Sequence, residues 1–553
     1  MTRKALEFFA RMRRNNKFRR NENFHDSFTC NKFLHELIAS NCCELSVKIL
    51  FDLISRGFCP HLSSCNSIIG IFCKLGNVET AKDFLKLMPR IHCHPDIVSY
   101  NTLFDGHCKN GDLKGALLLM NWISNEKYKP DAITFNILIN GFCKYRMQRE
   151  AFMFLGLMWK RYLPSVVTYS TFIDMFCKLR KLDMSYAFYK DMSNVGIAPN
   201  LVTLTCLIDG HCKNGNVEVA SELYKKMLEL KLLPNVITYN ALIDGFCKRG
   251  MLDRAEDLFS SMLEDGVYAN SAVYTSIIDG HFKKGNIGSA MKYLSQMHDQ
   301  GIKLDVAAYG AVIWGFCSIG QLDRAIKIRE EMEKKGLIPD EMILTTLIDG
   351  YFKAGNMRAA LAIYEKMLAR GFDPDVVTFS SLIDGLCKSG FVNEAREYFC
   401  KEKANEITYT ALIDGLCKQG MLHEAEMVFR EMSVKGFSPD KYPYTSRIIG
   451  LCKQGNLVEA FKLKNTMVRE GINPDLFTFS SLIWGLANKG LMIEAKQVLD
   501  DMLKRGIEPD RAVYGILIRG YGNPNNAVEI SLLHDEMRRR GLLITGSNLN
   551  GHE

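Results

Sequence analysis

The sequence lacks long hydrophobic runs and paired cysteine motifs. No stretch reaches about 18 consecutive apolar residues, the length typical of a membrane-spanning helix, so we expect no transmembrane span. None of the 18 cysteines stands in a C-x-x-C pair, a spacing typical of zinc and redox sites. We therefore expect small buried helix residues in a reducing compartment, rather than metal ligands or disulfides. Ten cysteines recur at intervals of about 35 residues or multiples of that length: Cys73, Cys108, Cys143, Cys177, Cys212, Cys247, Cys317, Cys387, Cys417 and Cys452.

A strong charge of one sign is also missing. The formal net charge is +8, and residues 1–26 supply most of it through eight basic and three acidic residues, so about +3 remains for the rest. Overall charge is therefore a weak reason to expect a polyanionic partner. With 47% hydrophobic and 24% charged residues the composition is that of an ordinary folded protein. A length of 553 residues exceeds a usual single core, which predicts several domains or a repeat array.

Signatures of catalysis are absent too. The chain has no Walker A loop, no G-x-S-x-G motif and no acidic nuclease cluster. His534-Asp535-Glu536 matches the H-x-E half of a zinc-deaminase signature, but no cysteine follows Cys452 to complete the zinc ligands. We predict no catalytic residue, no metal and no cofactor, and hence no enzyme. The aspartates of a recurring Asp-Gly pair are interpreted as structural: Asp105, Asp209, Asp244, Asp279, Asp349, Asp384 and Asp414.

What the sequence does contain is an internal repeat of about 35 residues. Tyr-Asn-Thr-Leu-Phe-Asp-Gly at 100–106 returns as Tyr-Asn-Ala-Leu-Ile-Asp-Gly at 239–245, and Pro-Asp or Pro-Asn closes most units. If position 1 follows that closing residue, units begin at 27, 62, 97, 132, 166, 201, 236, 271, 306, 341, 376, 406, 441 and 476. These fourteen repeats fill 27–510, a divergent repeat follows at 511–545, and 546–553 is a tail. The basic segment 1–26 resembles the second half of an earlier repeat. Unit 132–165 is one residue short. Unit 376–405 is five short, and we expect this unit to be the weak joint of the array.

Each unit is expected to form two helices. In the unit 236–270, Tyr239, Leu242, Ile243, Phe246 and Cys247 follow the spacing of one helical face. After Gly250 a second apolar stripe runs from Leu252 to Met262, and Gly266 ends the pair. Neither stripe can be buried by its own helix, but stacked units would bury both. We therefore predict an all-α, right-handed superhelical solenoid of about 15 two-helix, 35-residue repeats.

A different face of the first helix carries two rows that suit a nucleic acid. Apolar residues at position 2 would offer flat bases a stacking surface, and lysines at position 13 would offer one cation per phosphate. The alternative for the lysines is a solvated side chain that the helix dipole favours near the C-terminus. The stacking candidates are Val98, Ile133, Val167, Val202, Ile237, Val377, Ile407, Tyr442 and Phe477. The phosphate candidates are Lys74, Lys109, Lys144, Lys178, Lys213, Lys248, Lys283, Lys353, Lys388, Lys418 and Lys453.

Positions 5 and 35 are the most informative. Position 5 is mostly Asn, Ser or Thr, and position 35 is mostly Asp or Asn. Helix capping and turns favour these residue types, but so does base recognition. An Asp can accept the ring N–H of uracil or guanine, whereas an Asn amide can donate to the bare ring nitrogen of adenine or cytosine. From the residues alone, capping and base recognition both remain open.

The repeat resembles the pentatricopeptide repeat family, specifically the P-type arrays of land plants. The likeness covers nearly the whole chain and rests on V-x-T-Y-[NST]-x-L-I-D-G-x-C-K-x-G, on Ala and Met in the second helix, and on a closing Gly-x-x-Pro-Asp. The related tetratricopeptide repeat opens with W-x2-L-G-x2-Y, which is missing here. The resemblance implies single-stranded RNA binding in an organelle, with one nucleotide per repeat and the RNA running 5′ to 3′ along the array.

The resemblance also implies a base code, in which Asn at position 5 favours pyrimidines and Ser or Thr favours purines. Gly310 has no reading side chain and leaves its nucleotide undefined, and Asn31 with His61 and Gly515 depart from the pattern. The expected site is UUCAACG-x-GAGGG, with C or U at the sixth nucleotide. The reading pairs are Asn66 with Asp96, Asn101 with Asp131, Asn136 with Ser165, Ser170 with Asn200, Thr205 with Asn235, Asn240 with Asn270, Thr275 with Asp305, Thr345 with Asp375, Ser380 with Asn405, Thr410 with Asp440, Thr445 with Asp475, and Ser480 with Asp510.

The expected function is therefore sequence-specific binding of an organellar transcript, in RNA processing, stabilisation, splicing or translation. RNA-processing proteins are further expected partners, since cleavage would need a separate nuclease. The alternative from another class is a protein-binding scaffold of tetratricopeptide type. The basic start fits a transit peptide in charge but lacks the serine enrichment. The family favours the mitochondrion over the chloroplast.

Overall fold

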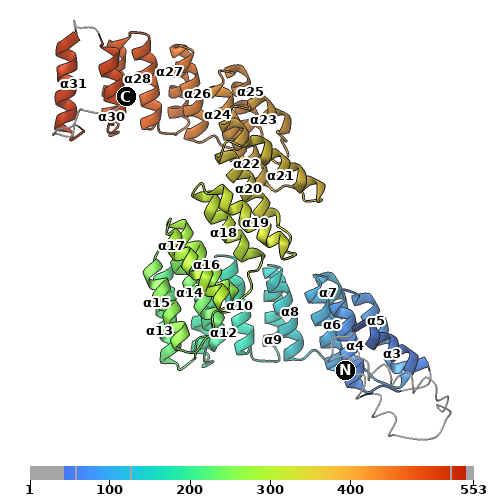
Figure 1. The fold of residues 1–553 in the computed structure, drawn as a ribbon. Helices are drawn as coiled ribbons and strands as arrows, with labels where there is room; N and C mark the ends of the chain where they lie inside the picture. Colours follow the sequence, from blue (N-terminus) through green and yellow to red (C-terminus); the bar gives the residue numbers. More distant parts are fainter. Residues whose placement is uncertain (1–30, 32–42, 56–58, 125–127, 523–525, 543–553) are drawn as a thin grey trace. The chain divides into compact units, whose positions relative to one another are not determined.

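The computed structural model describes residues 31, 43–55, 59–124, 128–522 and 526–542, and the elements within these ranges are helices. The basic segment 1–26 and the tail 546–553 lie outside the described residues. Internal contacts divide the chain into two compact units, residues 1–280 and 281–553. Consecutive helices form hairpins, and neighbouring hairpins within a unit lie side by side (Figure 1). The fold is thus an all-α solenoid of two-helix repeats, as the sequence predicts.

In the first unit the odd-numbered helices from α3 to α15 are second helices of hairpins, and the even-numbered ones are first helices. The bounds are α3 Cys43–Ser55, α4 Leu62–Lys74, α5 Val78–Leu87 with the 3-10 turn η1 Met88–Ile91, α6 Ile97–Lys109, α7 Leu113–Ser124, α8 Ala132–Lys144, α9 Gln148–Trp159, α10 Val166–Lys178, α11 Leu182–Asn194, α12 Leu201–Lys213, α13 Val217–Glu229, α14 Val236–Lys248 and α15 Leu252–Glu264. Helix α16, Ser271–Lys283, contains the division between the units.

The second unit continues the alternation. Its helices are α17 Ile287–Asp299, α18 Val306–Ser318, α19 Leu322–Lys334, α20 Glu341–Lys353, α21 Met357–Ala369, α22 Val376–Lys388, α23 Val392–Tyr398, α24 Glu406–Lys418, α25 Leu422–Val434, α26 Lys441–Lys453, α27 Leu457–Arg469, α28 Leu476–Asn488, α29 Met492–Lys504, α30 Arg511–Gly520 and α31 Ala527–Arg539. Within the ranges that the structure describes, no helix is both long and apolar enough to cross a membrane.

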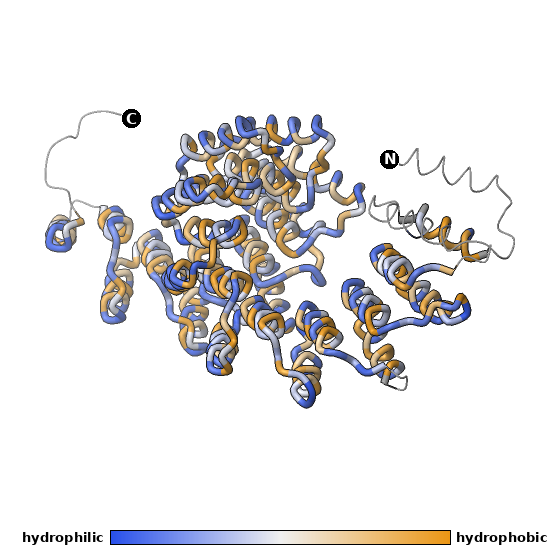
Figure 2. Tube along the Cα trace, turned by 90° about the horizontal axis from the view of Figure 1, so that it is seen from below, coloured by the Kyte–Doolittle hydropathy of each residue, from blue (hydrophilic) through white to orange (hydrophobic). Residues whose placement is uncertain are grey.

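Each hairpin is built from local signals that the repeat supplies. Gly250 and Gly266 adopt φ of +72° and +73°, a left-handed conformation that glycine tolerates and that ends each helix of the hairpin. Hydrophobic and hydrophilic residues alternate along the helices (Figure 2), as expected for helices with one buried face. On α14 and α15, Tyr239, Ile243 and Met262 are completely buried, so the predicted stripes form the core.

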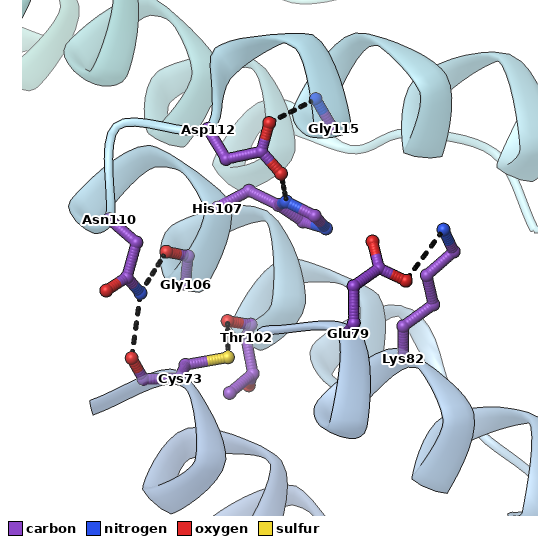
Figure 3. A network of polar contacts seen from close by, with 9 residues as sticks. All are labelled: Cys73, Glu79, Lys82, Thr102, Gly106, His107, Asn110, Asp112 and Gly115. Carbon is purple, nitrogen blue, oxygen red and sulfur yellow. Dashed lines mark hydrogen bonds and ion pairs between the residues drawn. The ribbon is translucent and has the colours of Figure 1, made fainter. Parts of the chain in front are cut away.

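The recurring cysteines and glycines meet at the joint between adjacent first helices. A Cβ added to Gly245 would lie 2.7 Å from both Cβ and Sγ of Cys212 in the preceding repeat, closer than real Cβ atoms approach. Around the equivalent pair Cys73 and Gly106, the Asn110 amide donates to both backbone carbonyls, at 2.8 and 2.9 Å (Figure 3). The cysteines of this row are free and buried, and burial raises the pKa of the Cys143 thiol to about 12. Their role is close packing of helices.

The shortening of unit 376–405 affects its second helix. Helix α23 has 7 residues, whereas α21 and α25 have 13 each. Helix α22 keeps its full 13 residues, and Asn405 still caps α24 by accepting the Thr408 N–H at 2.9 Å. Phe399, which follows α23, contacts the ring of Tyr409 edge-on at 5.3 Å. The layer of first helices is therefore continuous across this short repeat.

Candidate nucleic-acid interface

The position 35 side chains cap the first helix of the next repeat. Asp131 Oδ1 accepts the backbone N–H of Thr134 at 2.7 Å, and Asn200 Oδ1 accepts that of Thr203 at 2.9 Å. Corresponding caps occur at Asp96, Asn235, Asn270, Asp305, Asp340, Asp375, Asn405, Asp440, Asp475 and Asp510. Ser165 instead lies 3.4 Å from the Thr168 hydroxyl through its own Oγ. The capping role that the residue types allow is thus present at every Asp and Asn of the row.

Capping fixes which atom of each position 35 side chain remains for a base. Because Oδ1 accepts the cap, an Asp has a carboxylate oxygen left as an acceptor, whereas an Asn has its amide N–H groups left as donors. Burial acts to raise the pKa of Asp131, but hydrogen bonds from Thr134 and Asn101 outweigh it and hold that pKa below its usual value. The carboxylate is therefore ionised at neutral pH and acts only as an acceptor. The cap and base recognition are compatible functions of one side chain.

The position 5 side chains lie beside the caps and are mostly covered. The Asn101 amide donates to Asp131 Oδ1 at 3.2 Å, and the Asn66 amide donates to Asp96 Oδ1 at 3.4 Å. Ser380 donates to Asn405 Oδ1 at 3.2 Å, so the pair of the short repeat is also brought together. Five of the position 5 side chains are only 6–8% exposed, and the other position 5 members of the reading pairs are half-buried. The five are Asn101, Ser170, Thr205, Ser380 and Thr445. The structure thus places both members of these pairs at one edge of the first helices, with an unused polar atom.

The position 2 side chains are exposed despite being apolar. Ile237 is 62% exposed and Phe477 is 70% exposed, on helices whose opposite faces are fully buried. The other candidates are similarly exposed: Val98, Ile133, Val167, Val202, Val377, Ile407 and Tyr442. Met342, at the same position of its repeat, is 76% exposed and extends the row. An apolar side chain repeated once per hairpin beside a polar pair is suited to contact a flat ring.

Seven of the eleven lysines at position 13 form an ion pair that was not predicted from the sequence. In seven repeats the ammonium lies 2.6–2.7 Å from Oδ2 of the aspartate four residues earlier, as in Lys248 with Asp244. These lysine side chains are 50–70% exposed. Exposed i,i+4 pairs of this kind are worth only about 0.3–0.5 kcal/mol. A phosphate can compete for such a lysine, but the aspartate row cancels much of the positive charge along this edge.

A third polar row, at position 3, was also not predicted from the sequence. Thr134, the residue capped by Asp131, is completely buried, and its hydroxyl donates to Asn101 Oδ1 of the preceding repeat at 2.7 Å. The signal was visible in the Thr of the V-x-T-Y motif, but a buried hydroxyl near a helix start is easily taken for a capping residue alone. In the described part of the chain, no cluster of His, Cys, Asp and Glu side chains could hold a metal ion.

Comparison with protein families identifies the repeat. The family model described as the PPR repeat family matches 60–109, 95–144, 164–212, 199–248, 234–281, 339–388, 404–453, 444–488 and 481–523. Family models described as the PPR repeat match 300–333, and also 133–163, 272–302, 377–401 and 512–542. These matches cover most of the chain, which belongs to the pentatricopeptide repeat family.

Solved structures show the same fold. The crystal structure of the pentatricopeptide repeat protein PPR10 from maize is 21% identical, with a TM-score of 0.58, and the match covers 92% of this chain and 83% of that one. The structure of PPR10 in complex with an 18-nt psaJ RNA element is 23% identical with a TM-score of 0.60, covering 94% and 80%. No curated protein matches the chain. At this level of identity the likeness concerns the fold.

Proposed function

We propose that this protein binds single-stranded RNA in a sequence-specific manner, with one nucleotide per repeat. The observation that carries the proposal is the combination, in one hairpin after another, of an exposed apolar side chain and a capped polar pair. Ile133 is 61% exposed, and Asn101 and Asp131 form such a pair beside it. A base needs a flat apolar contact for its ring and polar atoms for its edge. PPR10, which shares the fold, is solved with an RNA element.

The polar atoms left over by the caps match the base edges. An Asp with Oδ1 on the helix N-terminus keeps an acceptor for the ring N–H of uracil or guanine, and an Asn keeps a donor for adenine or cytosine. Applied along the array, the pairs specify UUCAACG-x-GAGGG. Family membership supports the organelle as compartment, the mitochondrion before the chloroplast, and a P-type role in processing, stabilisation, splicing or translation of a transcript. The protein would act by occupying RNA, with any cleavage left to a partner.

A competition experiment tests the proposal against a protein-binding role. Labelled UUCAACGAGAGGG should bind and be displaced by the same unlabelled single strand, but not by its duplex. Binding should weaken steeply as salt rises, by about 0.7 logarithmic units of the binding constant per unit log salt for each phosphate contact. Failure to bind any single strand, or equal competition by the duplex, would contradict the proposal. A protein-binding scaffold is expected to bind none of these RNAs.

A further inference from the structure

Buried hydroxyls at position 3 link eight of the twelve reading pairs to the following repeat. In these eight, the hydroxyl lies 2.5–2.9 Å from the position 5 side chain of the pair. All eight of these residues are at most 1% exposed. They are Ser99, Thr134, Thr168, Thr203, Thr238, Thr378, Thr408 and Thr478. Because solvent does not reach them, these side chains would not contact a bound strand, and they can influence it only through the residues that they hold.

The junction at Thr134 shows what the hydroxyl holds. Its Oγ1 lies 2.7 Å from Asn101 Oδ1 and 2.8 Å from Asp131 Oδ1, and it accepts the Asp131 backbone N–H at 3.1 Å. The Asn101 amide nitrogen then points to Asp131 Oδ1, at 3.2 Å. One hydroxyl therefore fixes the rotation of the Asn101 amide, with its oxygen turned inward and its N–H groups toward the pair. It also anchors the carboxylate oxygen that caps the helix.

A junction without the hydroxyl is arranged differently. Unit 271–305 has Val273 at position 3, completely buried, and its backbone N–H still reaches the Asn270 cap, at 3.2 Å. Asn240, the position 5 residue before it, accepts a longer hydrogen bond of 3.3 Å from the Ser276 hydroxyl, at position 6. The fold tolerates valine here, but the amide takes a different partner.

We propose that the position 3 hydroxyl is a positioning residue that sharpens base choice at the preceding repeat. This inference rests on the proposed RNA-binding function. Where Ser or Thr is present, as at Thr134, the side chains at positions 5 and 35 are both held in one orientation before the RNA arrives, so a mismatched base cannot be accommodated by rotating them. Where the hydroxyl is replaced, as at Val273, these side chains can turn and the repeat accepts more than one base. A residue that served only the helix cap would affect stability without affecting base choice.

Substitution of Thr134 tests the proposal. Thr134→Val should bind RNA with U at the second nucleotide, but its preference for U over C should fall by roughly fivefold, the equivalent of one net hydrogen bond. Thr134→Ser should keep the wild-type preference, because Ser99 makes the same contact at 2.6 Å to Asn66. Melting curves of both variants would verify folding, and the buried Val273 is the natural precedent for valine at this position.

The reverse substitution tests for a gain of base discrimination, a result that loss of folding cannot produce. Val273→Thr should increase discrimination between C and U at the sixth nucleotide, opposite Asn240, by a similar factor. Wild-type discrimination in Thr134→Val, or an unchanged ratio in Val273→Thr, would overturn the positioning role while leaving RNA binding intact. Wild-type protein with no preference among the four bases would instead overturn the proposed function, and the inference with it. The ratio between two bases, rather than the affinity, distinguishes these outcomes.

Discussion

Asp131→Asn separates helix capping from base recognition at a single side chain. In the wild type, Oδ1 accepts the Thr134 N–H at 2.7 Å and the Asn101 amide at 3.2 Å. Asparagine can keep both bonds through its own Oδ1, as Asn200 caps with its Oδ1 at 2.9 Å. The change is thus confined to the remaining atom, which becomes an N–H donor instead of an oxygen acceptor. We expect base preference at the second nucleotide to move from U to C.

The magnitude follows from the atoms that would be left unpaired. A uracil N–H opposite the asparagine N–H groups forms no hydrogen bond, and an unsatisfied polar group of this kind costs about 1–3 kcal/mol, or roughly 5- to 150-fold in binding. The free energy of unfolding should change by less than about 1 kcal/mol, because Asp and Asn are nearly equivalent caps.

Fluorescence anisotropy with four 13-nucleotide RNAs that differ only at the second position would measure the switch. Asp131→Ala is the matched control, since it removes the cap and the reading atom together. We expect it to lose about 1 kcal/mol of stability and to discriminate poorly between U and C. If Asp131→Asn folds normally and still prefers U, the side chain only caps the helix and the base assignments fail.

Three further outcomes follow from other features of the structure. Replacing the lysine row at Lys178, Lys213 and Lys248 with alanine should weaken binding of matched and mismatched RNA alike, and should flatten the salt slope by about 0.7 per lost contact; an unchanged slope would mean that these lysines do not meet phosphates. Burial without a hydrogen-bond partner lowers the pKa of His211. The free energy of unfolding should therefore fall as pH drops below about 6.5, because the imidazole of the unfolded chain is protonated there while that of the folded chain stays neutral. His211→Phe, which copies the buried Phe246 of the next repeat, should lessen that loss between pH 7 and 5 in melting curves, and an equal loss in both proteins would refute it. Amide exchange should be faster in the 7-residue helix α23 than in the 13-residue α21, and equal protection would show that the short repeat is as stable as its neighbours.

The repeat made most of the fold predictable. Apolar residues spaced along Tyr239–Cys247 indicate one buried face, and the deficit in unit 376–405 indicates the shortened helix α23. Local rules of this kind can be applied to one segment at a time. The close packing of Cys212 against Gly245 explains why the two residues recur together, but contacts between repeats depend on how hairpins stack, which a period does not specify.

The sequence predicted which repeat positions form the candidate site, but it did not predict the hydrogen bonds and ion pairs between their side chains. The exposure of Ile237 agrees with its place outside the apolar stripe of its helix, and the cap at Asp131 agrees with its residue type. The spacing of Asp244 and Lys248 is typical of an ion pair, but a lysine repeated once per unit is equally typical of a phosphate contact. The Thr134 hydroxyl was missed because its partner, Asn101, is 33 residues away in the sequence. Such a bond becomes visible only when two repeats are placed side by side.

Selection from a random pool of single-stranded RNA tests the central claim most directly. The purified protein should enrich sequences that contain UUCAACG-x-GAGGG, with no preference at the eighth nucleotide, opposite Gly310, and C or U at the sixth. The order of the bases should follow the order of the repeats from the N-terminus to the C-terminus. Recovery of sequences with no shared motif, or of a motif unrelated to the pairs at positions 5 and 35, would contradict the account.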